Sequence, residues 1–121
     1  MSILTCGSGG TYSTIAAAIA AATAADYVQL VSDMTEDVSL NKDILGIQGD
    51  SPTSRRTWNS TGSWVNLDIN SNTLACEIKD LIFNRTSGNY ELIRFSTFSG
   101  STRIKVLWCK FTGTVAADMV G

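Results

Sequence analysis

The stretch LACEIKDLIF, residues 74–83, is followed 28 residues further along the chain by TRIKVLWCKF, residues 102–111. In both stretches apolar and polar side chains alternate, and the alternation breaks once, at Lys79-Asp80 and at Leu107-Trp108. Alternation is typical of strands, because successive side chains point to opposite faces of a sheet. Each stretch therefore predicts two short strands joined by a bend. The apolar residues align without a gap, as Cys76/Ile104, Ile78/Val106, Leu81/Cys109 and Phe83/Phe111.

Further alternating segments place these two stretches in a longer repeat. Val65-Leu67-Ile69 precedes the first stretch, and Ile93-Phe95, at the same 28-residue step, precedes the second. An earlier unit matches the others if residues 50–63 form an inserted loop, and its segments are Val28-Leu30, Val38-Leu40 and Leu45-Ile47. Three units of three short strands predict an all-β solenoid of about three coils, in which stacked coils bury one another's inward faces.

The N-terminal residues follow a different pattern. Ile15, Ile19 and Ala22 fall on one face at helical spacing within an alanine-rich run. This predicts an α-helix over residues 14–25, with Ser13 as the N-cap. We expect residues 1–26 to form an N-terminal cap over the first open end, and residues 27–121 to form the coils of the same single domain.

The other end of the predicted solenoid has no such cap. A further 28-residue step from Ile93 ends at residue 121, where a fourth coil would begin. An open coil exposes unpaired strand edges and apolar side chains. We therefore expect either a partner over this end or further coils, and we predict that Val115, Met119 and Val120 contact the partner.

Composition excludes several kinds of chemistry. The 121 residues include no histidine, which excludes a Ser-His-Asp triad and a histidine-bearing zinc site. The three cysteines form no CxxC motif, and Cys76 and Cys109 lie on the apolar phase of strands, which predicts buried thiols. A pI of about 4.8 disfavours a nucleic-acid partner. Residues 15–25, the longest apolar stretch, are too short to span a membrane, and no secretory signal is recognisable.

Charge is distributed unevenly along the chain. Residues 1–54 carry a net charge of −5 and residues 55–121 one of +3. A molecule polarised in this way could pack head-to-tail or onto a charged lattice. A calcium site in the acidic first unit is conceivable, but the spacing matches no calcium loop, so we favour a solvated acidic face. The acidic residues concerned are Asp33, Glu36, Asp37, Asp43 and Asp50.

Part of the chain is similar to a known family. GSGGTYSTI at residues 7–15 and the alanine-rich run, followed by DYVQL at 26–30 and LGIQG at 45–49, resemble the opening of the pectin-lyase-like right-handed β-helix superfamily. Pectinesterases and many phage tail-spike, tail-fibre and other virion proteins begin in this way. The resemblance covers roughly residues 5–50 by motif. It implies a short right-handed parallel β-helix.

The resemblance does not extend to the catalytic motifs of pectinesterases. DLIFN at 80–84 is similar to the Asp-Phe-Ile-Phe-Gly motif of pectinesterases, but the glutamine-bearing motifs before it and the arginine–tryptophan motif after it are absent. Asp80 falls at the predicted bend, where a turn-capping acid is common. Glycoside hydrolysis needs two facing carboxylates, and the spacing fixes neither Asp68 with Asp80 nor Glu77 with Glu91 at a suitable separation. We expect no enzyme, no catalytic residue, no cofactor and no metal.

Without a catalytic set, this chain would act by assembly. We expect a structural protein of a bacteriophage virion, made in the host cytoplasm. A head decoration (cement) protein or another small exterior component is favoured, as a homotrimer that binds other virion proteins such as the major capsid protein or a tail protein. The alternatives are the base of a tail fibre or tail spike and, in a different class, the N-terminal part of a polysaccharide-acting enzyme or adhesin. Neither a nucleic acid nor a membrane is expected as a partner.

The inserted loop supplies further contact candidates. Arg55, Arg56 and Trp58 lie on an otherwise polar segment, and Arg and Trp are enriched at interface hot spots. The alternative for Trp58 is that its side chain folds back over the solenoid wall. Trp64 and Trp108 are expected to pack against the coils.

Overall fold

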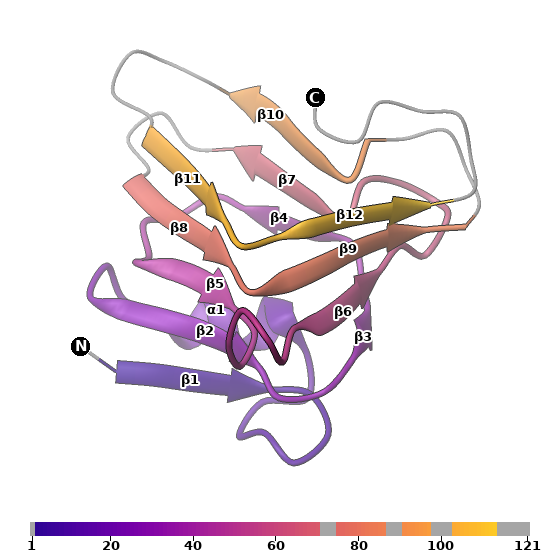
Figure 1. Ribbon diagram of the computed structural model, residues 1–121. Helices are drawn as coiled ribbons and strands as arrows, with labels where there is room; N and C mark the ends of the chain where they lie inside the picture. The colour runs from indigo at the N-terminus through magenta and orange to yellow at the C-terminus, as the bar shows by residue number, and fades with distance from the viewer. Residues whose placement is uncertain (1, 71–74, 87–90, 98–102, 114–121) are drawn as a thin grey trace.

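The computed structural model describes residues 2–70, 75–86, 91–97 and 103–113, which form a parallel β-solenoid of about four turns with one short helix near the N-terminus (Figure 1). The elements are β1 (Ser2–Cys6), α1 (Ile15–Ala21), β2 (Asp26–Leu30), β3 (Met34–Thr35), β4 (Val38–Leu40), β5 (Gly46–Gln48), β6 (Arg56–Asn59), β7 (Leu67–Asn70), β8 (Ala75–Lys79), β9 (Leu81–Arg85), β10 (Ile93–Thr97), β11 (Arg103–Leu107) and β12 (Lys110–Gly113). The predicted fold class is confirmed.

Three parallel sheets run along the solenoid. Sheet A has the order β1-β2-β5-β8-β11, sheet B the order β3-β6-β9-β12, and sheet C the order β4-β7-β10. Each complete turn contributes one strand to each sheet, as β5, β6 and β7 do. Strands of successive turns therefore lie one above the other, and β11 and β12 lie over β8 and β9 (Figure 1).

The strand register confirms the 28-residue step in sheets A and B. The residue pairs are Cys76/Ile104, Ile78/Val106 and Phe83/Phe111. Sheet C departs from this step, because Ile93 pairs with Leu67 and not with Val65. The connections to sheet C differ in length between turns, so one constant step does not describe all three sheets.

The two interruptions of the alternation are bends, as predicted. Asp80, between β8 and β9, has φ of 59°, and Trp108, between β11 and β12, has φ of 56°. These left-handed conformations redirect the chain from sheet A to sheet B. One turn earlier the corresponding residue is Gly49, where a Cβ atom would lie 2.0 Å from the carbonyl oxygen of Asp80. Only glycine fits that close approach.

The expectation of about three coils is wrong, because the segment predicted as an inserted loop contains a strand. β6 lies within residues 50–63 and pairs with β3 on one side and β9 on the other. It completes a second turn, which raises the number of turns to about four. Only Trp58 of this strand points into the core and is buried, so the strand has no visible alternation in the sequence.

Helix α1 is shorter than predicted and begins one residue later than expected. Its N-cap is Thr14 rather than Ser13, since the Thr14 hydroxyl accepts a hydrogen bond of 3.0 Å from the backbone N–H of Ala17. Beyond the helix, the Asp26 carboxylate accepts hydrogen bonds from the backbone N–H and the hydroxyl of Thr23, at 2.9 and 3.0 Å. This turn ends the cap and directs the chain into β2.

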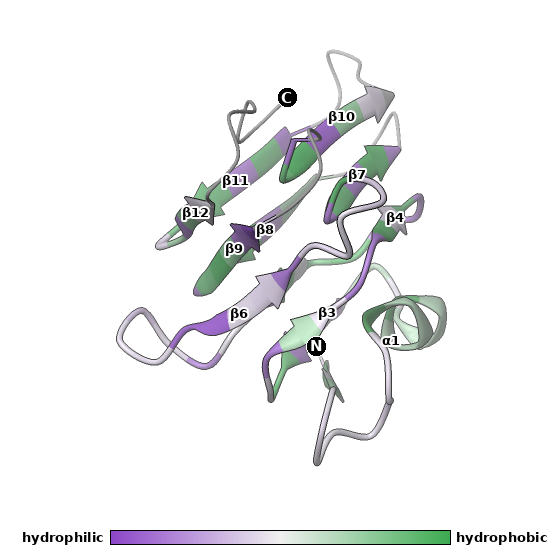
Figure 2. Ribbon diagram, turned by 90° about the vertical axis from the view of Figure 1, so that its right-hand side faces the viewer, coloured by the Kyte–Doolittle hydropathy of each residue, from purple (hydrophilic) through white to green (hydrophobic). Residues whose placement is uncertain are grey.

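The N-terminal cap also contains a strand that was not predicted. β1 precedes the helix and pairs in parallel with β2, from Ser2 opposite Asp26 to Cys6 opposite Leu30. The helix packs against β1, β2 and β4 and buries Ile15, Ala18 and Ile19. Figure 2 shows this apolar helix beside β4, at the far end of the solenoid from β10.

The core consists of inward-facing columns, one residue from each turn. In sheet A the column is Val28, Ile47, Ile78 and Val106. In sheet B the rings of Trp58, Phe83 and Phe111 stack, with centroids 5.2 Å and 5.6 Å apart. Because each turn covers the one before it, the burial of a column residue depends on whether another turn follows.

Candidate functional site

Among the residues that the structure describes, the last coil (92–97 and 103–113) supplies the final strand of each of the three sheets. β10, β11 and β12 are the terminal strands of sheets C, A and B. The inward column of sheet A becomes more exposed at this coil. Ile78 is fully buried, whereas Val106, directly above it, is 38% exposed. Phe111 is half-buried, while Phe83 below it has no exposed surface. A terminal strand with unpaired backbone groups is a template for pairing with another chain.

Trp108 gives this end an exposed aromatic side chain. The residue is 64% exposed, so the expectation that it packs against the coils is wrong. Asp80 occupies the same bend one turn earlier and is only 7% exposed. The position of Trp108 in the last coil, and not its phase in the repeat, explains the difference. Trp64 is half-buried, in line with packing against the coils.

The predicted contact loop lies beside this bend. Nε of Arg55 donates a hydrogen bond of 2.6 Å to the carbonyl oxygen of Trp108, although the two residues are 53 positions apart. Arg56 instead forms an ion pair of 2.7 Å with Asp50, which holds its guanidinium against the loop. The structure thus brings Arg55 together with the last coil, a contact that the sequence did not predict. Partner binding by either arginine stays a prediction.

Trp58 must be removed from the contact surface. Its side chain has no exposed surface, its ring stacks on Phe83, and its Nε1 donates a hydrogen bond of 2.8 Å to the carbonyl oxygen of Glu36. A partner cannot reach a side chain enclosed in this way. The other interpretation of Trp58, a side chain folded back over the solenoid wall, is closer to the structure. The indole is buried more deeply than that, because it lies inside the solenoid and not over its wall. Val115, Met119 and Val120, the other predicted contacts, lie outside the described residues.

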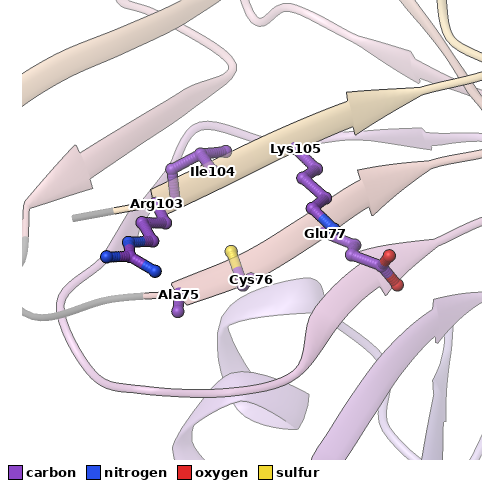
Figure 3. Close-up of a pocket in the computed structure, with 6 residues that line it drawn as sticks. All are labelled: Ala75, Cys76, Glu77, Arg103, Ile104 and Lys105. Carbon is purple, nitrogen blue, oxygen red and sulfur yellow. The ribbon is translucent and has the colours of Figure 1, made fainter. Parts of the chain in front are cut away.

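Basic side chains gather on the last coil. Its charged residues are all cations and all exposed: Arg94, Arg103, Lys105 and Lys110. Arg103 and Lys105 extend from β11 beside an open hollow of about 370 Å³ that residues of the paired strands β8 and β11 line (Figure 3). Glu77, on β8, is the acidic residue lining this hollow, and its carboxylate already accepts a hydrogen bond of 2.7 Å from the hydroxyl of Tyr27.

The acidic residues of the first turn stabilise backbone turns. The two carboxylate oxygens of Glu36 accept hydrogen bonds from the N–H groups of Ile15 and Ala16, at 2.8 and 2.9 Å, and so hold the N-terminus of α1. Oδ1 of Asp33 accepts one of 2.9 Å from the N–H of Thr57 in the next turn. Carboxylates near a helix N-terminus are favourable, because the free N–H groups carry partial positive charge.

Asp37, another acid of the first turn, also has a hydrogen-bond partner, because its Oδ2 accepts a hydrogen bond of 2.6 Å from the Thr61 hydroxyl. The first-turn acids are therefore less solvated than expected, and four of the five, Asp33, Glu36, Asp37 and Asp50, have defined backbone or side-chain partners. Within the described ranges, no three His, Cys, Asp or Glu side chains come together in a way that could hold a metal ion.

The candidate catalytic acids are placed separately. Asp68 is buried on β7 in sheet C and accepts a hydrogen bond of 2.9 Å from the Ser96 hydroxyl. Asp80 is buried at the bend between sheets A and B, in the turn position predicted for it. Asp68 therefore has a local hydrogen-bond partner, and both carboxylates are buried in the wall of the solenoid.

One buried cation was not anticipated. Arg85 ends β9 with its side chain almost fully enclosed, and its Nη2 donates to the carbonyl oxygen of Trp64 and, at 3.4 Å each, to Asn66 Oδ1 and the carbonyl oxygen of Glu91. These contacts tie the segments that lead into β7 and β10 to β9. The inward phase of Arg85 in LIFNR is the sequence signal that could have revealed it.

The three thiols are free, and their environment makes them weak nucleophiles. Burial raises the pKa of Cys6 and of Cys76 to about 12 and also raises the pKa of Cys109. A thiol with a raised pKa is protonated near neutral pH. Cys76 is buried as predicted, whereas Cys109, in the last coil, is only half-buried.

Among the described residues, no helix is both long enough and apolar enough to cross a membrane. Comparison of the chain with protein-family models, with curated proteins and with solved structures finds no match. What is established is therefore the architecture, a parallel β-solenoid of three sheets.

Proposed function

We propose that this chain is a non-enzymatic structural protein that acts by assembly through its last coil. The observation that carries the proposal is the contrast within one column, where Ile78 is fully buried and Val106 above it is 38% exposed. Together with the terminal strands β10, β11 and β12, such a surface is costly to leave in water and favourable to cover.

The proposed setting is the exterior of a bacteriophage virion, as a head decoration or cement protein. The support for this setting is the resemblance of residues 7–15, 26–30 and 45–49 to the opening of β-helix proteins that include virion components. A homotrimer bound to the major capsid protein is the proposed arrangement, since closed symmetry is the usual way to satisfy exposed protomer surfaces.

The base of a tail fibre or tail spike is the second candidate. It is favoured by the parallel edges of β10, β11 and β12, onto which additional strands can be added in the existing register. The two candidates differ in location on the particle, and both predict a virion component.

The test is recovery of the chain from phage particles. Particles prepared from the source of this sequence are purified on a density gradient, and the chain is quantified by mass spectrometry against the major capsid protein. A decoration protein is recovered at a fixed ratio near that of the capsid subunits, whereas a tail component is recovered at a small fraction of it. Recovery only from the soluble fraction would overturn the proposal.

A further inference from the structure

Charge changes sign along the axis of the solenoid. Residues 1–25 contain no charged side chain, and residues 26–45 contain five acids and one lysine. Residues 92–113 contain four cations and no acid. The cations of the last coil are exposed, and two of them, Arg103 and Lys105, alternate along β11 with the inward residues Ile104 and Val106. The terminal edge of sheet A is therefore basic on its outer face and apolar on its inner face.

The inward rows of the last coil define what would cover them. Val106 ends the aliphatic column of sheet A, and Phe111 ends the aromatic stack of sheet B. Each requires an apolar side chain directly above it to reach the burial seen one turn below. In the outer row, a side chain placed above Arg103 or Lys105 would stand opposite a cation, and opposite charges on neighbouring strands stabilise pairing.

We propose that the last coil binds an acidic segment of a different protein, which adds to β11 as a further strand. Acidic side chains of that segment stand above Arg103 and Lys105, and apolar ones stand above Ile104 and Val106. Strand addition supplies the backbone hydrogen bonds, and the alternating rows supply the selectivity. This inference rests on the proposed assembly through the last coil and decides between a second copy and another protein as its occupant.

A second copy of the chain does not supply this pattern. Two last coils facing each other would bring four cations of one copy against four of the other. The opposite end of a second copy presents β1 and α1, which lie in the uncharged residues 1–25. A nucleic acid or an anionic membrane would satisfy the cations but would not fill the apolar row of Ile104 and Val106. An acidic strand satisfies both rows.

The test uses the intact chain and a short synthetic peptide in which glutamate and valine alternate, with a fluorescent label for anisotropy. The matched peptide has lysine in place of each glutamate. We expect the glutamate peptide to bind and the lysine peptide to bind at least about tenfold more weakly. Raising the ionic strength from about 0.05 M to about 0.5 M should weaken binding of the glutamate peptide several-fold, because exposed charges are screened.

Variants locate the site. The Lys105→Glu variant is expected to weaken binding of the glutamate peptide about tenfold, and the matched control Lys42→Glu, which makes the same charge change in the first turn, is expected to leave it unchanged. Val106→Asp should also abolish binding by placing a charge in the apolar row. Circular dichroism checks that each variant keeps its β-structure. Equal binding to wild type and Lys105→Glu would overturn the proposal.

A nucleic acid, an anionic membrane or a second copy of the chain on the last coil would each give a different result. Equal binding of an oligothymidylate, or of phosphatidylserine vesicles, would overturn the strand pairing in favour of a general polyanion surface. Self-association that the peptide displaces would assign the last coil to a second copy and overturn the proposal. The two proposals fail separately: peptide binding without recovery from particles removes only the virion role, and recovery without peptide binding removes only the acidic strand.

Discussion

At the N-terminal end of the solenoid, helix α1 lies over the first turn and buries Ile15 and Ile19 in the core. At the other end, Val106 and Phe111 have the same inward orientation and remain partly exposed. The side chains are of the same kind, and their columns continue from one turn to the next. Exposure is therefore set by whether an element covers the turn, and a local pattern of apolar residues does not reveal that.

The two ends also use charge differently. Glu36 and Asp33, near the first turn, accept hydrogen bonds from backbone N–H groups of the helix and of the second turn. Their charge is part of the fold. Arg103 and Lys105 are exposed on the terminal strand, with Lys105 beside Glu77 of the turn below (Figure 3), and the benefit of such exposed charges depends also on what approaches them. This contrast separates charges that stabilise the chain from charges available to a partner.

The largest effect is expected from two equivalent substitutions in the aromatic stack. Phe83→Ala should destabilise the protein by about 3–5 kcal/mol, because it opens a cavity in a fully buried position. Phe111→Ala should cost less than half as much, since its ring is already half exposed. Urea unfolding followed by circular dichroism measures both. Equal losses would mean that the last coil is as well covered as the turn below it.

The helix provides the second test of the difference between the ends. Ile15→Ala should cost about 2–5 kcal/mol, because Ile15 is fully buried against the first turn. Val106→Ala, which also shortens an aliphatic column residue, should cost less than about 1 kcal/mol, because Val106 is already 38% exposed. Thermal and urea unfolding of the two variants measure the two losses of stability. A small loss for Ile15→Ala would show that α1 does not act as a cap.

The accuracy of the sequence-based predictions follows the same division. The bends at Asp80 and Trp108 were predictable, because the strands of four or five residues on either side show their alternation in the sequence. β6 was missed since a short strand with one inward residue, Trp58, shows no period. The sequence does not predict β1, because the segment before the predicted helix is expected to form part of the cap. Alternation identifies inward side chains only when a strand is long enough to repeat.

The candidate site was less predictable than the fold. The sequence leaves Trp58 open between a partner contact and a side chain folded over the solenoid wall, and it predicts that Trp108 packs against the coils. The structure buries Trp58 and exposes Trp108. The contact of Arg55 with Trp108 joins residues from different turns, and only the stacking of the turns brings them together. A sequence shows which residues could form contacts with a partner. The order of the turns decides which of them are exposed.

A third, smaller effect is expected at the hydrogen bonds between Glu36 and the helix. Glu36→Gln removes the negative charge from the N-terminus of α1 and leaves one acceptor oxygen for two N–H groups. We expect a loss of about 1–2 kcal/mol. Asp43→Asn is the matched control, because it removes the same charge from an exposed position in the same turn and should change stability by less than about 0.5 kcal/mol. Indistinguishable variants would contradict the structural role assigned to Glu36.

The smallest effect is expected at the exposed bend and has the opposite sign. Trp108 has a left-handed backbone, which is unfavourable by about 1–2 kcal/mol for most residues and less so for asparagine. Its ring is 64% exposed, and the hydrogen bond from Arg55 goes to its backbone carbonyl, so Trp108→Asn removes little packing and retains that acceptor. We therefore expect Trp108→Asn to stabilise the isolated chain by about 0.5–1 kcal/mol.

The neighbouring Leu107 provides the control for that gain. It ends β11 and is 36% exposed, but its φ is not in the left-handed region, so Leu107→Asn should give no stabilisation. If Trp108→Asn instead destabilised the chain by more than about 1 kcal/mol, the indole would be contributing packing energy to the solenoid. In that case Trp108 would belong with the covered residues of the earlier turns. A gain in stability would leave an exposed tryptophan in a strained conformation, and such strain is often found at functional sites.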